Sequence, residues 1–266
     1  MKLLILPDAA QAVARAAGLI AARLRRAPGS VLGLATGGTM EPVYAELVRL
    51  SRAGLAPAGQ MRSFNLDEYV GLPAEHPQSY RQFMEHHLFG PLAIDAGRSY
   101  LPDGMAADPE AEAARYDAAI AEAGGIDLQL LGIGANGHIG FNEPTSSLAS
   151  RSRVKTLARR TLEDNRRFFG PGEVVPRFAI TMGIGTILEA REVLLLATGA
   201  GKAQAVAGMV EGPLAAACPA SALQLHPRAT VICDAAAAGN LALRDYYETV
   251  HPAGGETPLH RTGSEG

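Results

Sequence analysis

Short apolar runs alternate along the chain with longer stretches in which apolar residues recur every three or four positions. The apolar runs predict parallel strands at residues 2–6, 30–35, 61–66, 126–133, 192–198 and 229–233. The stretches between them predict helices at residues 8–26, 41–53, 79–88 and 201–210, and one more that starts at Asp108 and Pro109. This alternation predicts an α/β fold: a doubly wound, mostly parallel, Rossmann-like sheet with helices on both faces.

Composition narrows the class of protein. With 266 residues, of which 47% are hydrophobic, the chain is long enough for one large domain, which we expect to span residues 1–250. The turn-rich residues 251–266 are expected to form a disordered tail. A formal net charge of −3 gives no reason to expect nucleic acid or an anionic membrane as a partner.

Cysteine content and hydropathy indicate the cytoplasm. Cys218 and Cys233 are the only cysteines, which argues against a disulfide framework and for a reducing compartment. Residues 2–6 are too short for the core of a signal peptide. No run approaches the ~18 apolar residues of a membrane span.

Polar and glycine-rich clusters follow the predicted strands at their carboxyl ends, where open α/β sheets bind ligands. Two of them, ATGGT (35–39) and GAGK (199–202), each join a strand to a helix. Backbone N–H groups at a helix start can bind phosphate, and Lys202 would add a cation in the first helical turn. The alternative for either is a plain tight turn. Neither is a Walker motif, because Leu196 and Ala203 occupy the positions that would be glycine and Ser/Thr.

The third cluster, NLDEYVGL (65–72), places Asp67 and Glu68 immediately after a strand. The alternatives are a solvated turn with a capping carboxylate, or an active-site base. A carboxylate partly shielded from water could have its pKa raised toward a value useful for proton abstraction.

The fourth cluster, GIGANGHIGFNEP (132–144), holds His138 and Glu143 within a glycine-rich frame. It matches G-x-G-x-x-G literally, but no helix start follows and no acidic residue lies about 20 positions on, so dinucleotide binding is rejected. A zinc deaminase signature and a serine hydrolase elbow are also absent from the sequence. An orienting carboxylate near a histidine suggests an acid/base pair.

A basic stretch lies between these loops, and it is either a solvated face or a set of cations that closes over an anion. Its members are Arg153, Lys155, Arg159, Arg160, Arg166 and Arg167. The residues together indicate an α/β enzyme that acts on a small phosphorylated substrate by proton transfer, with no metal, nucleotide or other cofactor.

Four stretches, in this order, resemble the glucosamine-6-phosphate deaminase family: LGLATGGT, SFNLDEYVGL, LLGIGANGHIGFNEP and FAITMGIGTIL. The resemblance runs from about residue 1 to 250. It implies conversion of glucosamine 6-phosphate and water to fructose 6-phosphate and ammonia. It also implies that Asp67 moves a proton from C2 to C1, that His138 assists ring opening and that Glu143 holds or relays to His138. The implied phosphate ligands are Gly37, Gly38, Thr39, Lys202 and Arg167, the last in NRRFF (165–169), which resembles a mobile helical lid.

The sequence departs from some family members at Asn136, where they carry an aspartate that completes an Asp–His–Glu relay. Asparagine can accept a hydrogen bond but supplies no negative charge, which leaves Glu143 as the main charged partner of His138.

The resemblance further implies regulation. Ser146, Ser147, Arg153 and Lys155 match the segment that binds N-acetylglucosamine 6-phosphate in allosteric, hexameric members, and either Tyr246 or Tyr247 matches the associated tyrosine. We therefore expect a homo-oligomer, with a hexamer favoured.

Two rival functions remain. A 6-phosphogluconolactonase is disfavoured by Tyr69 and FNEP (141–144), and a sugar-phosphate sensor by the absence of a DNA-binding segment.

Overall fold

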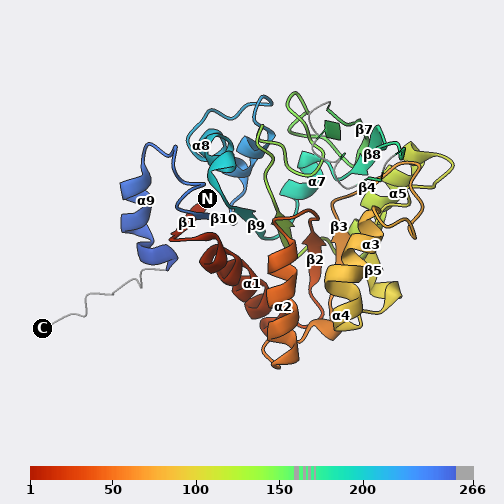
Figure 1. Ribbon diagram of the computed structural model, residues 1–266, viewed down its shortest axis with the longest axis horizontal. Coiled ribbons are helices and arrows are strands. Elements are labelled where there is room, and N and C mark those ends of the chain that lie inside the picture. Colours follow the sequence, from red (N-terminus) through yellow and green to blue (C-terminus); the bar gives the residue numbers. More distant parts are fainter. Residues whose placement is uncertain (159–161, 164–165, 167–168, 171, 256–266) are drawn as a thin grey trace, which may run out of the picture.

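The computed structural model describes residues 1–158, 162–163, 166, 169–170 and 172–255. Its main sheet has seven strands in the order β1-β10-β9-β6-β2-β3-β5, and all neighbouring pairs are parallel (Figure 1). The strands are β1 (Lys2–Leu6), β2 (Val31–Leu34), β3 (Arg62–Asn65), β5 (Ser99–Tyr100), β6 (Leu128–Leu131), β9 (Val193–Ala197) and β10 (Ala229–Asp234). The predicted α/β class and parallel sheet are confirmed, and only the two-residue β5 was not predicted.

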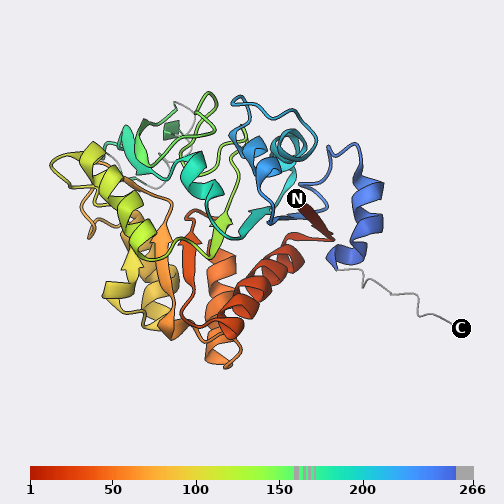
Figure 2. The ribbon, with the colours of Figure 1, turned by 180° about the vertical axis from the view of Figure 1, so that it is seen from behind.

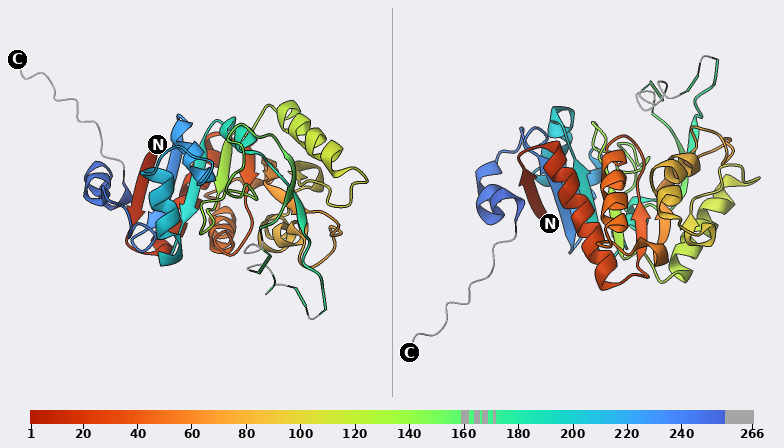
Figure 3. Two further views of the ribbon diagram at one scale, coloured as in Figure 1. Left: turned by 90° about the horizontal axis from the view of Figure 1, so that it is seen from above. Right: turned by 60° about the horizontal axis from the view of Figure 1, so that its bottom comes forward.

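Helices cover both faces of this sheet. From β1 through β2 and β3 to β5 the chain moves toward one edge, and from β6 through β9 to β10 it returns toward the other. Because such crossovers are right-handed, the helices of the two halves lie on opposite faces, as α2 and α5 do when seen from above (Figure 3, left). The α-helices are α1 (Ala9–Arg26), α2 (Glu41–Arg52), α3 (Tyr80–Met84), α4 (Gly90–Leu92), α5 (Pro109–Glu122), α7 (Ile184–Leu188), α8 (Ala203–Val210) and α9 (Arg244–Val250).

Short helical turns complete the description and refine two sequence expectations. The helix expected at 79–88 is α-helical only through Met84 and continues as a π-helical turn, η2 (Glu85–Phe89), in which Gly90 N–H bonds to Glu85. The turn η4 (Ala200–Lys202) precedes α8, so Lys202 lies at the N-cap of α8 and not in its first turn. The remaining 3₁₀ turns are η1 (Ala58–Gln60), η3 (Ala96–Arg98), η5 (Pro219–Leu225) and η6 (Pro252–Gly254).

A second, three-stranded antiparallel sheet lies beside the carboxyl edge of the first, with the order β4-β8-β7 (Figure 2). It consists of β4 (Asp67–Tyr69), β8 (Phe178–Thr181) and β7 (Arg153–Thr156). The apolar run expected to be one strand through residue 66 therefore ends at Asn65, and Asp67 begins a strand of the other sheet. That change of sheet places Asp67 in a hydrogen-bonded ladder.

The described chain continues past the expected domain boundary at residue 250. The turn η6 packs against β1, and Gly254 is buried so closely that a Cβ there would lie 2.8 Å from Leu6 Cδ1. Residues 251–255 are therefore part of the packed domain, while 256–266 lie outside the described residues.

Candidate active site

The sheet reverses its winding direction between β2 and β6. Ligands bind outside the carboxyl ends of strands at such a switch point. A cavity of about 460 Å³ lies there. Its lining comes from the loops after β2 and β6, from the start of β4 and from η4, and includes Gly37, Gly38, Thr39, Asp67, Tyr80, Gly134, His138, Gly140, Phe141 and Lys202. The geometry thus brings together most of the residues that the sequence selected.

Asp67 is the buried carboxyl of this cavity. It lies opposite Thr181 in the β4–β8 ladder and is only 5% exposed. Burial, with a smaller contribution from the charge of Glu68, raises the pKa of Asp67 to about 8, against a hydrogen bond from Thr181 that lowers it. Gly140 approaches from the facing loop: a Cβ there would lie 3.4 Å from Asp67 Oδ2. A carboxyl with this pKa can act as a base near neutral pH.

Glu68 points away from that cavity and has a structural role. Its two carboxyl oxygens accept hydrogen bonds from the backbone N–H groups of Tyr69 (2.9 Å), Tyr80 (3.0 Å) and Arg81 (3.0 Å). It therefore caps the amino end of α3, whose next N–H, that of Gln82, is capped by Ser79. The sequence left open a solvated turn with a capping carboxylate or an active-site base: Glu68 is a cap, but a buried one at 3% exposed, and Asp67 is the carboxyl that faces the cavity.

His138 and Glu143 face each other across the glycine-rich loop. The Nδ1 atom of His138 lies 3.4 Å from Oε2 of Glu143, close enough for an ion pair when the imidazole is protonated. No described residue makes a hydrogen bond with Nδ1. Oε2 of Glu143 instead accepts a hydrogen bond of 2.8 Å from Nδ2 of Asn136. Asn136 Oδ1 in turn accepts the backbone N–H of His138, at 3.2 Å. Asn136 thus positions both partners without adding charge.

The two glycine-rich turns contribute to the lining of the cavity, the first through Gly37 and Gly38 and the second through Lys202. Gly37 has φ +97°, and its carbonyl accepts the N–H of Met40, the residue that precedes α2. Gly199 has φ +85°, and its N–H donates to both carboxylate oxygens of Asp234, each at 3.0 Å. Asp234 was not selected from the sequence, because no motif signals a carboxylate at the end of β10. It fixes the turn that carries Lys202.

A family model described as glucosamine-6-phosphate isomerases/6-phosphogluconolactonase matches residues 7–232. The chain belongs to this family. It is 56% identical over 250 residues to the glucosamine-6-phosphate deaminase of Cellvibrio japonicus (strain Ueda107), covering 94% of this chain and 95% of that protein. It is 57% identical over 248 residues to the deaminase of Streptomyces coelicolor, covering 93% and 95%.

Solved structures of the glucosamine-6-phosphate isomerase/6-phosphogluconolactonase family have the same fold. A monomeric glucosamine-6-phosphate deaminase superposes with a TM-score of 0.87 at 42% identity, covering 90% of this chain and all of that one. The 6-phosphogluconolactonase of Trypanosoma cruzi reaches 0.72 at 22% identity, covering 91% and 97%. The second likeness shows the fold alone, whereas the first extends to the sequence.

An aromatic wall, not foreseen from the sequence, borders the cavity of this family member. Tyr69, Tyr80, Phe141 and Phe169 lie together, with ring centroids 4.9 Å apart for Tyr69 and Tyr80 and 6.1 Å for Tyr80 and Phe141. Burial raises the pKa of Tyr69 to about 12, and the Tyr80 hydroxyl also lies buried beside it, 3.3 Å away. These rings shield Asp67 from water on one side. The sequence shows them only as isolated aromatic residues.

The residues expected to form a regulatory site lie apart from the cavity. Ser146 is buried and Ser147 exposed on the loop after Glu143, and Arg153 and Lys155 lie on β7. Arg153 pairs with Thr181 of β8, and Lys155 with Ala179. Tyr246 and Tyr247 lie on α9, beside β1 at the other end of the molecule (Figure 1). Arg159, Arg160 and Arg167 lie outside the described residues, as does most of the expected lid; Arg166 is exposed.

Two further properties belong to the described part of the chain as a whole. None of its clusters of three or more His, Cys, Asp or Glu side chains has a geometry that could hold a metal ion. None of its helices is long and apolar enough to cross a membrane.

Proposed function

We propose that the chain converts glucosamine 6-phosphate and water to fructose 6-phosphate and ammonia, as a glucosamine-6-phosphate deaminase of amino sugar catabolism. The observation that carries this proposal is Asp67: a buried carboxyl with a pKa of about 8, beside a loop that carries a histidine. The identity of 50–57% to deaminases over most of the chain supports the same reaction.

The proposed mechanism starts with ring opening. His138 takes the proton of the C1 hydroxyl and returns one to the ring oxygen, so that the sugar becomes an open-chain aldehyde. The nearby Glu143 carboxylate stabilises the imidazolium that forms in this step, because the two groups are 3.4 Å apart. Asn136 keeps both side chains in place through its two hydrogen bonds.

Isomerisation and deamination follow. Ionised Asp67 removes the proton from C2 and delivers it to C1, while the C1 oxygen gains a proton and the amino nitrogen loses one. The aldehyde at C1 thereby becomes an alcohol, and C2 becomes an imine. Water adds to this imine, and ammonia leaves to give the ketone of fructose 6-phosphate. The aromatic wall and the burial of Asp67 keep the proton between substrate and carboxyl while it is transferred.

The phosphate of the substrate would bind between the two glycine-rich turns. Backbone N–H groups of Gly37, Gly38 and Thr39 at the start of α2 favour an anion, and Lys202 contributes a cation from the facing turn. Arg167 stays part of this proposal as a ligand from the lid, although it lies outside the described residues. No metal or nucleotide is needed for any of these steps.

Ammonia release tests this function directly. We expect the wild type to release ammonia from glucosamine 6-phosphate, and the Asp67→Asn variant to bind the same sugar phosphate with turnover reduced at least about a thousandfold, since a base in direct contact with the reacting carbon is lost. Hydrolysis of 6-phosphogluconolactone, measured in parallel, tests the rival. Consumption of the lactone alone would overturn the proposal.

We further propose that N-acetylglucosamine 6-phosphate activates the enzyme at Ser146, Ser147, Arg153 and Lys155, in a cytoplasmic homo-oligomer, with a hexamer favoured. Support comes from the register of the small sheet: Thr181 lies opposite Arg153 on one side and opposite Asp67 on the other. A ligand that moves β7 would therefore act on the base through a single strand. Since α9 lies at the far end of the molecule, Tyr246 or Tyr247 would have to come from a neighbouring subunit.

Kinetics and mass measurement test this second proposal. We expect sigmoidal dependence on substrate that becomes hyperbolic when the acetylated sugar phosphate is added, and Arg153→Gln should abolish that change. Arg177→Gln is a matched control, because Arg177 is an exposed arginine one residue before β8. Hyperbolic kinetics without the effector, or a monomer by light scattering, would contradict it; one relative is described as monomeric.

A further inference from the structure

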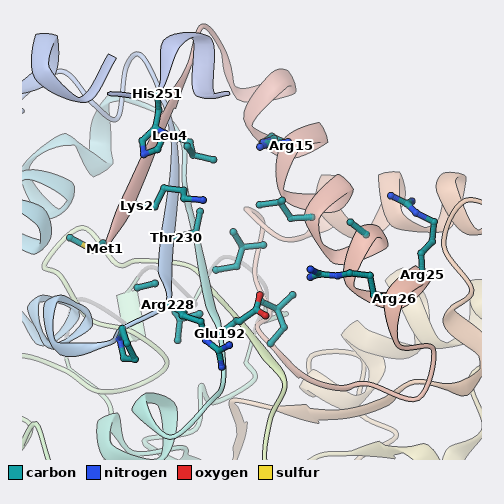
Figure 4. Close-up of a pocket in the computed structure, with 17 residues that line it drawn as sticks. Met1, Lys2, Leu4, Arg15, Arg25, Arg26, Glu192, Arg228, Thr230 and His251 are labelled. Atoms are coloured by element: carbon teal, nitrogen blue, oxygen red, sulfur yellow. The ribbon is translucent and has the colours of Figure 1, made fainter. Parts of the chain in front are cut away.

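A large cavity lies at the amino ends of β1, β6, β9 and β10, with a volume of about 850 Å³ (Figure 4). Arginines that line it have partners within the protein. Arg228 donates to the carbonyl of Arg191 at 2.8 Å, and Arg25 donates to that of Leu55 at 2.6 Å. These cations therefore require no ligand. The catalytic cavity, which contains Asp67, lies at the other edge of the sheet, and there one buried hydroxyl contacts two parts of the lining.

That hydroxyl belongs to Thr181, the last residue of β8, whose side chain is fully buried. Thr181 lies directly opposite Asp67 in the antiparallel ladder of β4 and β8, so the two side chains are on the same face of the small sheet. Its hydroxyl forms a hydrogen bond with the Asp67 carboxyl. The backbone N–H of Phe141 donates to the same hydroxyl oxygen, at 3.1 Å. One hydroxyl thus contacts both the base and the loop that carries His138 and Glu143.

Gly140 allows this loop to approach the two oxygen atoms closely. A Cβ at position 140 would lie 3.0 Å from Oγ1 of Thr181 and 3.4 Å from Oδ2 of Asp67. The φ angle of Gly140 is +55°, in the left-handed region that favours glycine. The two oxygens therefore lie beside the same Cα atom, and the backbone of the loop packs against them without an intervening side chain.

A second contact holds the same loop against the end of β8. Asn142 is fully buried, and its Nδ2 donates to the carbonyls of Met182 and Ile139, each at 2.8 Å. The backbone N–H of Met182 in turn donates to the carbonyl of Leu66, at 2.7 Å. Leu66 directly precedes Asp67. The end of β8 therefore holds the loop and the base in one relative position.

The hydroxyl of Thr181 has a single proton to donate and two lone pairs. Since it accepts the N–H of Phe141, its proton is available either to the carboxylate of Asp67 or to the carbonyl of Met182, at 3.4 Å. Donation to Asp67 favours the ionised base. When Asp67 has taken the proton from C2, the hydroxyl can turn to Met182, and it can turn back when that proton passes to C1. Both states of the base then have a partner while the loop stays in place.

We propose that Thr181 is a positioning residue of the reaction, whose hydroxyl holds ionised Asp67 and the His138 loop in the relative geometry that proton transfer between C2 and C1 requires. This inference rests on the proposed function, in which Asp67 is the base. Thr181 does not line the catalytic cavity, so it acts through Asp67 and the loop and not on the substrate. A misplacement of about 1 Å can slow such a reaction about a hundredfold.

Two variants separate the hydroxyl from the shape of the side chain. Thr181→Val keeps the shape and removes the hydroxyl, whereas Thr181→Ser keeps the hydroxyl. In Thr181→Val we expect kcat at pH 7 to fall at least about tenfold, because a hydrogen bond to a charged group is lost. KM should stay within about threefold, and the pH profile of kcat/KM should level off at a higher pH. Thr181→Ser should have a profile close to that of the wild type.

Thr186→Val is the matched control. Thr186 is likewise buried, and its hydroxyl donates to the carboxylate of Asp117 at 3.3 Å, but neither residue lines the catalytic cavity. This variant loses a comparable hydrogen bond and should keep the kcat and the pH profile of the wild type. A shift in Thr186→Val as large as that in Thr181→Val would overturn the proposal, because the effect would then not depend on contact with the base.

Carbon-13 NMR titration of the Asp67 carboxyl, assigned by comparison with Asp67→Asn, makes the test independent of turnover. The pKa of this carboxyl should be higher in Thr181→Val than in the wild type and unchanged in Thr181→Ser. If the wild type releases no ammonia from glucosamine 6-phosphate, the proposed function fails, and the titration still decides the role of the Thr181 hydroxyl.

Two further outcomes would overturn the proposal. One is a Thr181→Val variant with the pH profile and the Asp67 pKa of the wild type. The other is an equal loss of kcat in Thr181→Val and Thr181→Ser, which would assign the effect to the γ-methyl group and not to the hydroxyl. Thr181→Ala removes the same hydroxyl and takes the place of Thr181→Val if the valine variant is not folded by circular dichroism.

Discussion

The imidazole of His138 lies directly against the Cα atom of Gly134: a methyl group at that position would lie 2.3 Å from Cε1 and 2.5 Å from both ring nitrogens. No side chain larger than hydrogen can therefore occupy position 134 while the imidazole keeps its place. The glycine is required by this contact, since its φ is not in the left-handed region. The ring is held between Gly134 on one side and Glu143 on the other.

Gly134→Ala should consequently displace the imidazole and lower kcat at least about tenfold, because small misplacements of a catalytic group are costly. The free energy of unfolding should change little, since the backbone there accepts alanine. Steady-state kinetics and urea unfolding measure the two effects. Gly29→Ala, at a glycine with no atom within 4 Å of the added Cβ and away from the site, is the control. A kcat within twofold of the wild type would contradict this.

The pKa of Asp67 predicts the pH dependence of the reaction. Because the free enzyme must carry an ionised base, kcat/KM should rise about tenfold per pH unit below the pKa and level off near pH 8. Glu68→Gln removes the neighbouring charge that contributes to this shift, so its curve should level off at a lower pH. Initial rates across the pH range would show which of the two curves levels off at the lower pH. Coincident curves would argue against the contribution of Glu68.

The same pKa predicts how stability varies with pH. Between the ordinary pKa of 3.8 and the folded value of about 8, the folded state keeps a proton that the unfolded state has lost. The contribution of Asp67 to the free energy of unfolding is therefore largest below pH 3.8. It falls as pH rises toward 8, by at most about 1.4 kcal/mol per pH unit. The Asp67→Asn variant does not have this loss. Its free energy of unfolding relative to that of the wild type should therefore increase as pH rises. The exposed Asp245→Asn should gain no such advantage.

Asn136→Asp should change the pH profile of turnover more than the affinity for substrate. The substitution replaces the Nδ2 donor, 2.8 Å from Glu143 Oε2, by an oxygen. The new carboxylate would lie beside that of Glu143, and two like charges so close together disfavour the ionisation of both. We expect a displaced kcat profile with KM within about threefold, because Asn136 does not line the catalytic cavity. An unchanged profile would mean that a charge at position 136 has no effect on the groups that transfer protons.

Asp234→Asn should weaken substrate binding. With one carboxylate oxygen replaced by an amide, the N–H of Gly199 keeps only one acceptor of the two it now shares, at 3.0 Å each. The turn that carries Lys202 would loosen, so KM should rise by about three- to tenfold. We expect a smaller effect on kcat. A fall in kcat alone would indicate that Asp234 acts on the chemical step instead.

Much of this site is predictable from the sequence for a simple physical reason. Apolar runs mark the parallel strands, and the carboxyl ends of parallel strands share one edge of a sheet. Polar residues that follow separate runs, such as Asp67 and His138, must then lie near each other. The glycine-rich turns are predictable in the same way, since each joins a strand to a helix.

Other parts of the site have no local signal. The strands β4, β7 and β8 contain three or four residues each and mix polar or charged with apolar side chains, so their pairing is visible only in three dimensions. Asp234 supports Gly199 across 35 positions of sequence. The aromatic wall combines rings from β4, α3, the loop after β6 and the segment near Phe169, whose proximity depends on the packing of both sheets.

Alternation along β4 gives Asp67 and Glu68 their different tasks, since neighbouring residues of a strand point to opposite sides. A slip of β4 by one position against β8 would exchange them: a glutamate would face the substrate, and α3 would lose its cap. The loop between β3 and β4 is the single residue Leu66, which leaves no slack to absorb an inserted or deleted residue. This junction should therefore be one of the places in the chain where homologous proteins never differ in length.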